Sequence, residues 1–333
     1  MNNLTEEDKL KTLSIIFVKS GLKVGTYWPL ENGILESLKK TAQKVYIALP
    51  NQDLSNLVRK VKPDLVLVFN GFKLPIIEIK ELTKSGVKTA IWMTDDPYYS
   101  NITKRIAPYF DFVFTQEINC LSFYKSLGCR NVHFLPLAVN PKIYRPKIVD
   151  SKYQKDILFV GNAFGNRIEF FDKLSHYLSS KNVLISGLGW DRLSNYQLLK
   201  DKIKTTWLHP KEVVNYYNGS KIIINMHRSH NDQSFKANNS MNIQAFSPNP
   251  RTFEISACRA FQLTDIRKDL SSFYTPGYDI AVYESPSELI KKIEYYLTHE
   301  KERMKVASRA FKKIRNEHTF THRISKLFDI VFA

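Results

Sequence analysis

Short apolar runs alternate with polar, amphipathic stretches along the first part of the chain. The runs are rich in β-branched residues and are apolar throughout, which is typical of strands buried on both faces of a parallel sheet. They lie at 14–18, 45–49, 64–69, 89–93, 112–115 and 132–137. Stretches between them, such as 33–43 and 118–128, fit helices. Regular strand–helix alternation predicts a doubly wound α/β domain.

The segment 140–156 interrupts this rhythm with two prolines and mixed charge, and we interpret it as a linker. The alternation then resumes. Strands are predicted at 157–161, 183–187, 205–209, 222–226, 261–265 and 280–283, and helices at 170–180, 286–300, 301–318 and 322–331. The chain therefore predicts two Rossmann-like domains facing across a cleft, over 1–145 and 146–318. The remaining 319–333 form an amphipathic helix that would be able to pack back on the first domain.

The composition is that of a folded protein, with 43% hydrophobic and 24% charged residues. The formal net charge of +17 favours an anionic partner. Nucleotide diphosphates, acidic glycans and peripheral contact with anionic surfaces all remain open, because charge alone does not choose among them. No nucleic-acid-binding motif accompanies the charge, so no specific nucleic acid is expected.

Cysteine usage and hydropathy indicate a cytoplasmic protein. The three cysteines, Cys120, Cys129 and Cys258, are too few for a disulfide framework and have no CxxC spacing. No apolar run approaches the roughly 18 residues that would span a bilayer. The first twelve residues carry acids and no apolar core, so we expect no secretory signal.

The segment 248–258 holds the most informative chemistry. Asn249 is a good N-cap and Pro250 fits the first helical position, so a short helix is expected to begin there. Its first amides would form an anion site, to which Arg251 adds a bidentate phosphate donor. Glu254, one turn later, could accept hydrogen bonds from ribose hydroxyls. A capped helix with a surface Arg–Glu pair explains the same residues equally well.

Two further segments leave predicted strands of the second half. Gly161, Asn162 and Arg167 lie on the turn after the first strand, where glycine allows a ligand to approach the backbone. An ordinary strand–helix turn is the alternative. His227 and Arg228 follow the strand at 222–226 and are interpreted as contacts to the ligand of this half. They open a polar, aperiodic segment over 226–246, a length that is usually functional in a compact domain.

Candidate residues in the first half also follow strands. Asp95 and Asp96 could orient an acceptor hydroxyl or take its proton, although Asp-Asp-Pro is also ordinary turn chemistry. Gly21, Asn70 and Gly71 also follow strands of this half and are candidate contacts for the same substrate, the acceptor. His227-x-x-His230 lacks a third ligand of convincing spacing, so no metal is assigned. Trp190 and Trp207 would stack on a nucleobase or fill the core.

Several of these segments together resemble the CgeB-like (spore maturation protein) family of group 1 glycosyltransferases. The resemblance lies in NPRTFEISACRAFQLTD (249–265), FYTPGYDIAVYESPSELIKKIEYYL (273–297), ILFVGNAFGNR (157–167), IIINMHR (222–228), IWMTDDP (91–97) and DFVFTQE…FLPLAVNP (111–141). It covers nearly the whole chain in order. It implies a GT-B fold and a nucleotide-sugar donor, UDP-linked by expectation, held by the C-terminal domain. It further implies a protein or glycan acceptor facing the N-terminal domain, retention of configuration, no obligatory metal cofactor, and a mother-cell or spore setting.

The same resemblance assigns roles to single residues. Glu254 matches the second acid of the acid-x7-acid motif of related transferases, on the donor ribose, and Arg167 matches the base that pairs with the diphosphate. The first acid would fall at Phe246, so Asn249 and Arg251 are expected to replace its contact. This departure keeps open a noncatalytic binding or assembly protein of the spore surface. A sugar-nucleotide epimerase is a further alternative.

Overall fold

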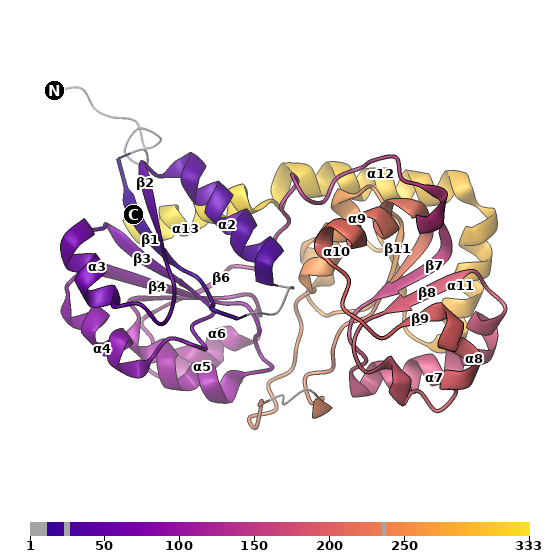
Figure 1. Cartoon of the computed structure of the whole chain (residues 1–333), viewed down its shortest axis with the longest axis horizontal. Helices are drawn as coiled ribbons and strands as arrows, with labels where there is room; N and C mark the ends of the chain where they lie inside the picture. The colour runs from indigo at the N-terminus through magenta and orange to yellow at the C-terminus, as the bar shows by residue number, and fades with distance from the viewer. Residues whose placement is uncertain (1–11, 23–26, 235–237) are drawn as a thin grey trace. The chain divides into compact units, whose positions relative to one another are not determined.

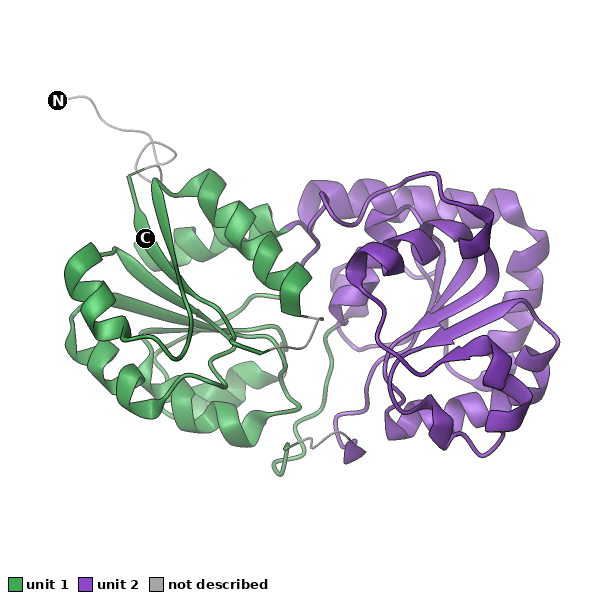
Figure 2. Cartoon of the chain, in the orientation of Figure 1, with its two compact units in different colours: residues 1–137, 238–247, 320–333 green, residues 138–237, 248–319 purple. Residues whose placement is uncertain are grey.

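The computed structural model describes residues 12–22, 27–234 and 238–333. The chain forms two compact units, coloured separately in Figure 2. Unit 1 comprises residues 1–137, 238–247 and 320–333, and unit 2 comprises residues 138–237 and 248–319. None of the helices in the described part of the chain combines the length and the apolar character that a membrane span requires.

Unit 1 contains a six-stranded parallel sheet in the order β2-β1-β3-β4-β5-β6. Its strands are β1 (Ser14–Val18), β2 (Lys44–Ala48), β3 (Leu65–Phe69), β4 (Lys88–Met93), β5 (Phe112–Thr115) and β6 (Asn131–Phe134). Its helices are α2 (Tyr27–Thr41), α3 (Leu54–Val61), α4 (Ile76–Lys84), α5 (Ser100–Ile106), α6 (Cys120–Ser126) and α13 (Phe320–Phe332). A short 3₁₀ helix, η1 (Ala107–Tyr109), follows α5. Figure 1 shows helices on both faces of this sheet.

The strands of this sheet are apolar because helices cover both of its faces. Every residue of β3 is buried, as expected for a strand covered on both faces. The apolar face of α13 packs against α2, and the buried guanidinium of Arg323 donates from Nε to the carbonyl of Pro136 at 2.9 Å. The last helix therefore belongs to unit 1, although 182 residues of unit 2 and of segment 238–247 separate it from Leu137 in sequence.

Unit 2 repeats the architecture with a parallel sheet in the order β12-β11-β10-β7-β8-β9. Its strands are β7 (Lys155–Val160), β8 (Val183–Ser186), β9 (Ile203–Lys204), β10 (Ser220–Asn225), β11 (Gln262–Asp265) and β12 (Ala281–Tyr283). Its α-helices are α7 (Gly165–Ser179), α8 (Tyr196–Leu199), α9 (Pro210–Gly219), α10 (Pro250–Ala257), α11 (Pro286–Thr298) and α12 (Glu300–Glu317). Its 3₁₀ helices are η2 (Ser151–Tyr153), η3 (Trp190–Arg192), η4 (Lys200–Lys202) and η6 (Leu270–Ser272).

The predicted doubly wound α/β class is confirmed in both units. Single elements differ from the prediction where burial was misjudged. The strand predicted at 205–209 is wrong, because the sheet ends with β9 at Lys204 and Trp207 is 39% exposed. Trp190 is fully buried and donates from Nε1 to the carbonyl of Gly161 at 2.7 Å, so it is a core residue and not a stacking surface.

The division of the chain differs in detail from the predicted domains. The boundary falls after Leu137, and segment 238–247 belongs to unit 1 instead of the second domain. Hydrogen bonds explain this placement. The Ser247 amide donates to Glu117 Oε2 at 3.0 Å, and the Ser247 hydroxyl accepts from the amide of Ile118 at 3.1 Å. The Asn238 amide donates to the carbonyl of Tyr98 at 2.7 Å. The sequence pattern of this polar segment carries no sign of these partners.

Candidate functional site

The start of α10 lies at the carboxyl end of β10 in unit 2. The predicted cap is confirmed, since Asn249 Oδ1 accepts from the amide of Thr252 at 3.1 Å and Pro250 occupies the first turn. Asn249 Nδ2 also donates to Asn225 Oδ1 at 3.0 Å, and Asn225 Nδ2 donates to Thr252 Oγ1 at 2.9 Å. This buried amide network fixes the positive end of the α10 dipole beside the end of the strand.

Gly161, directly after β7, is the point at which two predicted arginines meet. A Cβ at this position would lie 2.9 Å from Arg167 Nη1 and 3.3 Å from Arg251 Nη2. Both guanidinium groups therefore lie against the Gly161 backbone, and any side chain here would displace them. Because β7 and β10 are neighbours, the structure brings Arg167, Arg251 and the α10 start to one edge of the sheet.

The backbone takes up much of the hydrogen-bonding capacity of Arg167. This buried side chain donates from Nη1 to the carbonyl of Asn162 at 2.8 Å and from Nη2 to the carbonyl of Met226. Its guanidinium also lies 4.7 Å from the ring centre of Phe164. Arg167 thus ties the ends of β7 and β10 together. Its predicted contact with a diphosphate remains a prediction.

The side chains of Arg251 and Glu254 interact on α10, beside two buried tyrosines. Tyr144 donates its hydroxyl to the Glu254 carboxylate, and Arg251 donates to the hydroxyl of Tyr217. Burial raises the pKa of Glu254 to about 7, even though the Arg251 charge and the Tyr144 hydrogen bond oppose the increase. The pair is therefore a half-buried network, not the exposed surface pair that the sequence left open.

His227 follows β10 and is buried against the end of β11. Its Nδ1 lies 2.6 Å from Asp265 Oδ1, and its amide donates to the same oxygen at 2.9 Å. Burial lowers the pKa of His227. Burial would raise the pKa of Asp265, but His227 and Arg267 hold it below its usual range. The neutral imidazole must then carry its proton on Nδ1, because a carboxylate only accepts. Its Nε2 is a buried acceptor with no hydrogen-bond partner in the described protein.

Arg228 stabilises the loop that follows it in the sequence. Its Nε donates to Asp232 Oδ2 at 3.0 Å, and Asp232 Oδ1 accepts from the Gly165 amide at 2.9 Å. The guanidinium lies 4.3 Å from the ring centre of Phe164. Arg228 and Asp232 therefore connect the polar segment to the start of α7, which keeps Arg228 near Arg167 through the shared Phe164 ring.

In unit 1, Asp95 accepts hydrogen bonds from two residues, one at the start of α2 and one in the turn after β3. Its Oδ2 accepts from the Tyr27 hydroxyl at 2.7 Å and from Asn70 Nδ2 at 2.9 Å. Burial, followed by the Asp95 charge, raises the pKa of Tyr27 above its usual range. Asn70 follows β3, and its Oδ1 is a buried atom without a hydrogen-bond partner in the described protein. Asp95 is only half-buried, so it is the accessible acid of the pair.

Asp96 points instead into the core of unit 1. It is 1% exposed, accepts from Thr115 Oγ1 at 2.6 Å, and accepts from the Tyr124 hydroxyl on both carboxylate oxygens. Burial raises its pKa to about 7. This arrangement gives Asp96 a role in positioning the turn, and it does not favour the contact with an acceptor that the sequence suggested.

Gly21 and Gly71 are required by their surroundings. Gly71 has φ of +75°, and a Cβ there would lie 2.8 Å from Ile91 Cδ1. Gly21 has φ of +67°, and a Cβ would lie 2.9 Å from Pro50. Both conformations are unfavourable for other residues. Gly25, which follows Gly21 in the sequence, lies outside the described residues.

Several members of these groups were missed by the sequence analysis. They are Tyr27, Tyr144, Tyr217, Asp232 and Asp265. Only Asp265 carried a signal, because it is the polar end of an apolar strand. Among the described residues, His, Cys, Asp and Glu form no group of three or more that could hold a metal ion.

Two comparisons with known proteins identify similar sequences. Residues 167–329 match the family model described as Glycosyl transferase-like. Spore protein CgeB of Bacillus subtilis (strain 168) is 28% identical over 326 residues, which cover 96% of this chain and 99% of that protein.

Solved structures share the fold at low identity. Anabaena Alr3699/HepE in complex with UDP and glucose superimposes with a TM-score of 0.67 at 11% identity, covering 96% of this chain and all of that one (100%). Sucrose-phosphate synthase from Thermosynechococcus elongatus has a TM-score of 0.66 at 9% identity, covering 96% and 99%. The chain thus has the GT-B fold, is similar along its length to the spore protein CgeB, and is similar over residues 167–329 to glycosyl transferase-like proteins.

Proposed function

We propose that unit 2 binds a nucleotide-sugar donor, UDP-linked, at the carboxyl ends of β7, β10 and β11. The sugar is transferred to a protein or glycan acceptor that contacts the strand ends of unit 1 around Asp95. The UDP and UDP-glucose complexes of HepE, a protein of similar fold, support this choice of donor.

The observation that carries the proposal is the convergence at Gly161. Two guanidinium groups and the start of α10 gather at one edge of a parallel sheet, the edge where such folds bind ligands. A diphosphate placed there would accept hydrogen bonds from the Arg251 guanidinium and would lie at the positive end of the α10 dipole. Glu254, held by Tyr144, is then one helical turn away for the ribose hydroxyls.

The same charges serve the chemistry. As the glycosidic bond breaks, negative charge develops on the leaving diphosphate, and Arg251 and the α10 dipole stabilise it without an obligatory metal. His227 Nε2 accepts a hydrogen bond from a donor hydroxyl, since Asp265 fixes the imidazole tautomer. Asp95 orients the acceptor hydroxyl. By family resemblance the anomeric configuration is retained.

The direct test is a thermal-shift and calorimetric comparison of UDP-, GDP-, dTDP- and CMP-sugars on the intact chain. A ligand bound only by the folded protein raises the melting temperature. We expect a UDP-sugar to do so, with equal affinity after treatment with EDTA. If none of the four raises the melting temperature, the donor assignment fails. The configuration of the anomeric carbon in the product, read by proton NMR, tests retention separately.

A further inference from the structure

Two adjoining hollows open on unit 2, away from the candidate donor site. Each encloses about 520 Å³, within the range of small-molecule sites. They share a wall made of Lys147, Ile148, Asn218, Gly219 and Lys221.

The hollows lie at the opposite edge of the sheet. Lys155 and Lys221 are at the amino ends of β7 and β10, whereas Gly161 and Asn225 are at the carboxyl ends. Six residues of extended strand span about 20 Å, so a ligand in the hollows would not touch Arg251 or the start of α10. The hollows are therefore separate from the start of α10, and Tyr217, which lines the second hollow and contacts Arg251, lies between the two sites.

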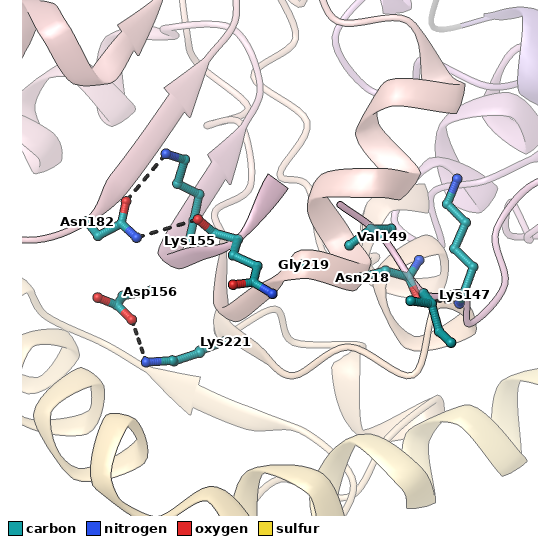
Figure 3. A pocket seen from close by; sticks show the side chains of 10 residues that line it. Lys147, Val149, Lys155, Asp156, Asn182, Asn218, Gly219 and Lys221 are labelled. Carbon is teal, nitrogen blue, oxygen red and sulfur yellow. Dashed lines mark hydrogen bonds and ion pairs between the residues drawn. The ribbon is translucent and has the colours of Figure 1, made fainter. Parts of the chain in front are cut away.

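The walls are strongly cationic. They carry five basic side chains and one acid, and these are Lys147, Lys155, Lys221, Arg259, Arg303 and Asp156. Lys221 Nζ lies 2.7 Å from Asp156 Oδ1. The buried Arg303 also interacts with the Asp156 charge and donates to the carbonyl of Tyr296. Lys147, Lys155 and Arg259 are then the wall cations without a carboxylate in the walls. Figure 3 shows the ion pair of Lys221 and Asp156, with Lys155 beside Asn182 and Lys147 beyond Asn218. A cationic, concave surface attracts anions.

Hydrogen bonds fix the wall that carries Lys147. Asn218 Oδ1 accepts from the Lys147 amide at 2.8 Å, while Asn218 Nδ2 donates to the carbonyls of Arg145 and Val214 at 3.1 and 2.8 Å. A Cβ on Gly219 would lie 2.5 Å from the carbonyl oxygen of Tyr153, so only glycine permits this close packing. The backbone of Lys147 is thus fixed at the rim of the hollows, and its exposed side chain carries the ammonium group that would contact a ligand.

From the paired hollows and the excess of cations in their walls, we propose that this edge of unit 2 binds a small phosphorylated molecule at a second site. Lysine ammonium groups suit phosphate oxygens as point charges. Asn182 and Gln154 add polar groups for the rest of the ligand.

The test is a methyl NMR titration of the intact chain with inorganic pyrophosphate, in the presence of saturating UDP. Ile148 is fully exposed and lines both hollows, so its δ1 methyl group reports on the site. The Met226 methyl group, beside Arg167, reports on the donor end. The Ile148→Val variant identifies the first signal by its loss.

We expect a saturable shift at Ile148 with no change at Met226, and at least tenfold weaker binding in Lys147→Gln/Lys221→Gln. The matched control is Lys173→Gln/Lys200→Gln, which removes the same charge from exposed positions of unit 2 outside the hollows. The proposal is overturned by a linear, non-saturating shift at Ile148, by equal weakening in the control, or by a shift that appears only at Met226.

Discussion

Replacing Arg251 by glutamine should weaken UDP binding by about ten- to one-hundred-fold. The substitution keeps a polar amide but shortens the side chain and removes its charge. In the structure the guanidinium lies against Gly161 and donates to Tyr217. In our proposal it also bonds the diphosphate. A hydrogen bond to a charged group contributes about 1.5–3 kcal/mol, and 1.4 kcal/mol is a factor of ten in affinity.

The substitution has a second, independent consequence at Glu254. The Arg251 charge opposes the effect of burial on that carboxyl, so removing it should raise the pKa of Glu254 further above its present value of about 7. More Glu254 would then be protonated at neutral pH. The titration of the Glu254 carboxyl carbon, followed by NMR, measures this shift without any ligand.

Isothermal titration with UDP at pH 7.5 measures the affinity of Arg251→Gln against the unmodified chain. Arg315→Gln is the matched control, because Arg315 is an exposed cation of unit 2 on α12. Its UDP affinity should stay within a factor of two of the original. Equal affinity in the Arg251 and Arg315 variants would refute the assignment of Arg251 to the diphosphate.

Three further outcomes follow from single groups. Glu254 has a folded pKa of about 7 against an ordinary 4.5, so its contribution to stability, about 3 kcal/mol, is present below pH 4.5 and lost as the pH rises through 7. Urea unfolding from pH 5 to 8.5 should therefore show a steeper loss of stability in the original chain than in Glu254→Gln, and parallel curves would contradict the buried carboxyl. Asp95→Asn should lower the rate of sugar transfer, measured as product formation, by about 10²- to 10⁴-fold. Its UDP affinity, measured by calorimetry, should not change. An unchanged rate of transfer would show that Asp95 does not act on the acceptor. Gly187→Ala would place a Cβ 2.1 Å from the Gly161 carbonyl oxygen, so we expect a loss of about 1–3 kcal/mol, larger than in Gly86→Ala, where no atom lies within 4 Å. Equal losses in the two glycine variants, compared by urea unfolding, would show that backbone conformation alone sets the cost.

Strand positions and the α10 start were predictable because they depend on local pattern. Apolar runs such as 65–69 become buried parallel strands wherever helices cover both faces, and the bounds of β1 and β5 agree with the predicted runs. Asn249 and Pro250 satisfy the first amides of a helix through neighbours in sequence, so the cap needed no tertiary information.

The site, in contrast, depended on contacts between residues far apart in the chain. The sequence proposed Asp95 and Asp96 as equals, but tertiary packing separates them, because Thr115 and Tyr124 bury one while Tyr27 and Asn70 hold the other at half burial. Glu254 and Arg251 are one turn apart in any helix, yet only Tyr144 and Tyr217 make the pair a buried network with a raised carboxyl pKa. The pattern of hydrophobic and polar residues by itself determined two α/β units and, to within a few residues, the ends of most of their strands. Only the folded chain decided which of the polar groups at those ends face a ligand, because burial and hydrogen bonding are set by neighbours that sequence spacing does not reveal.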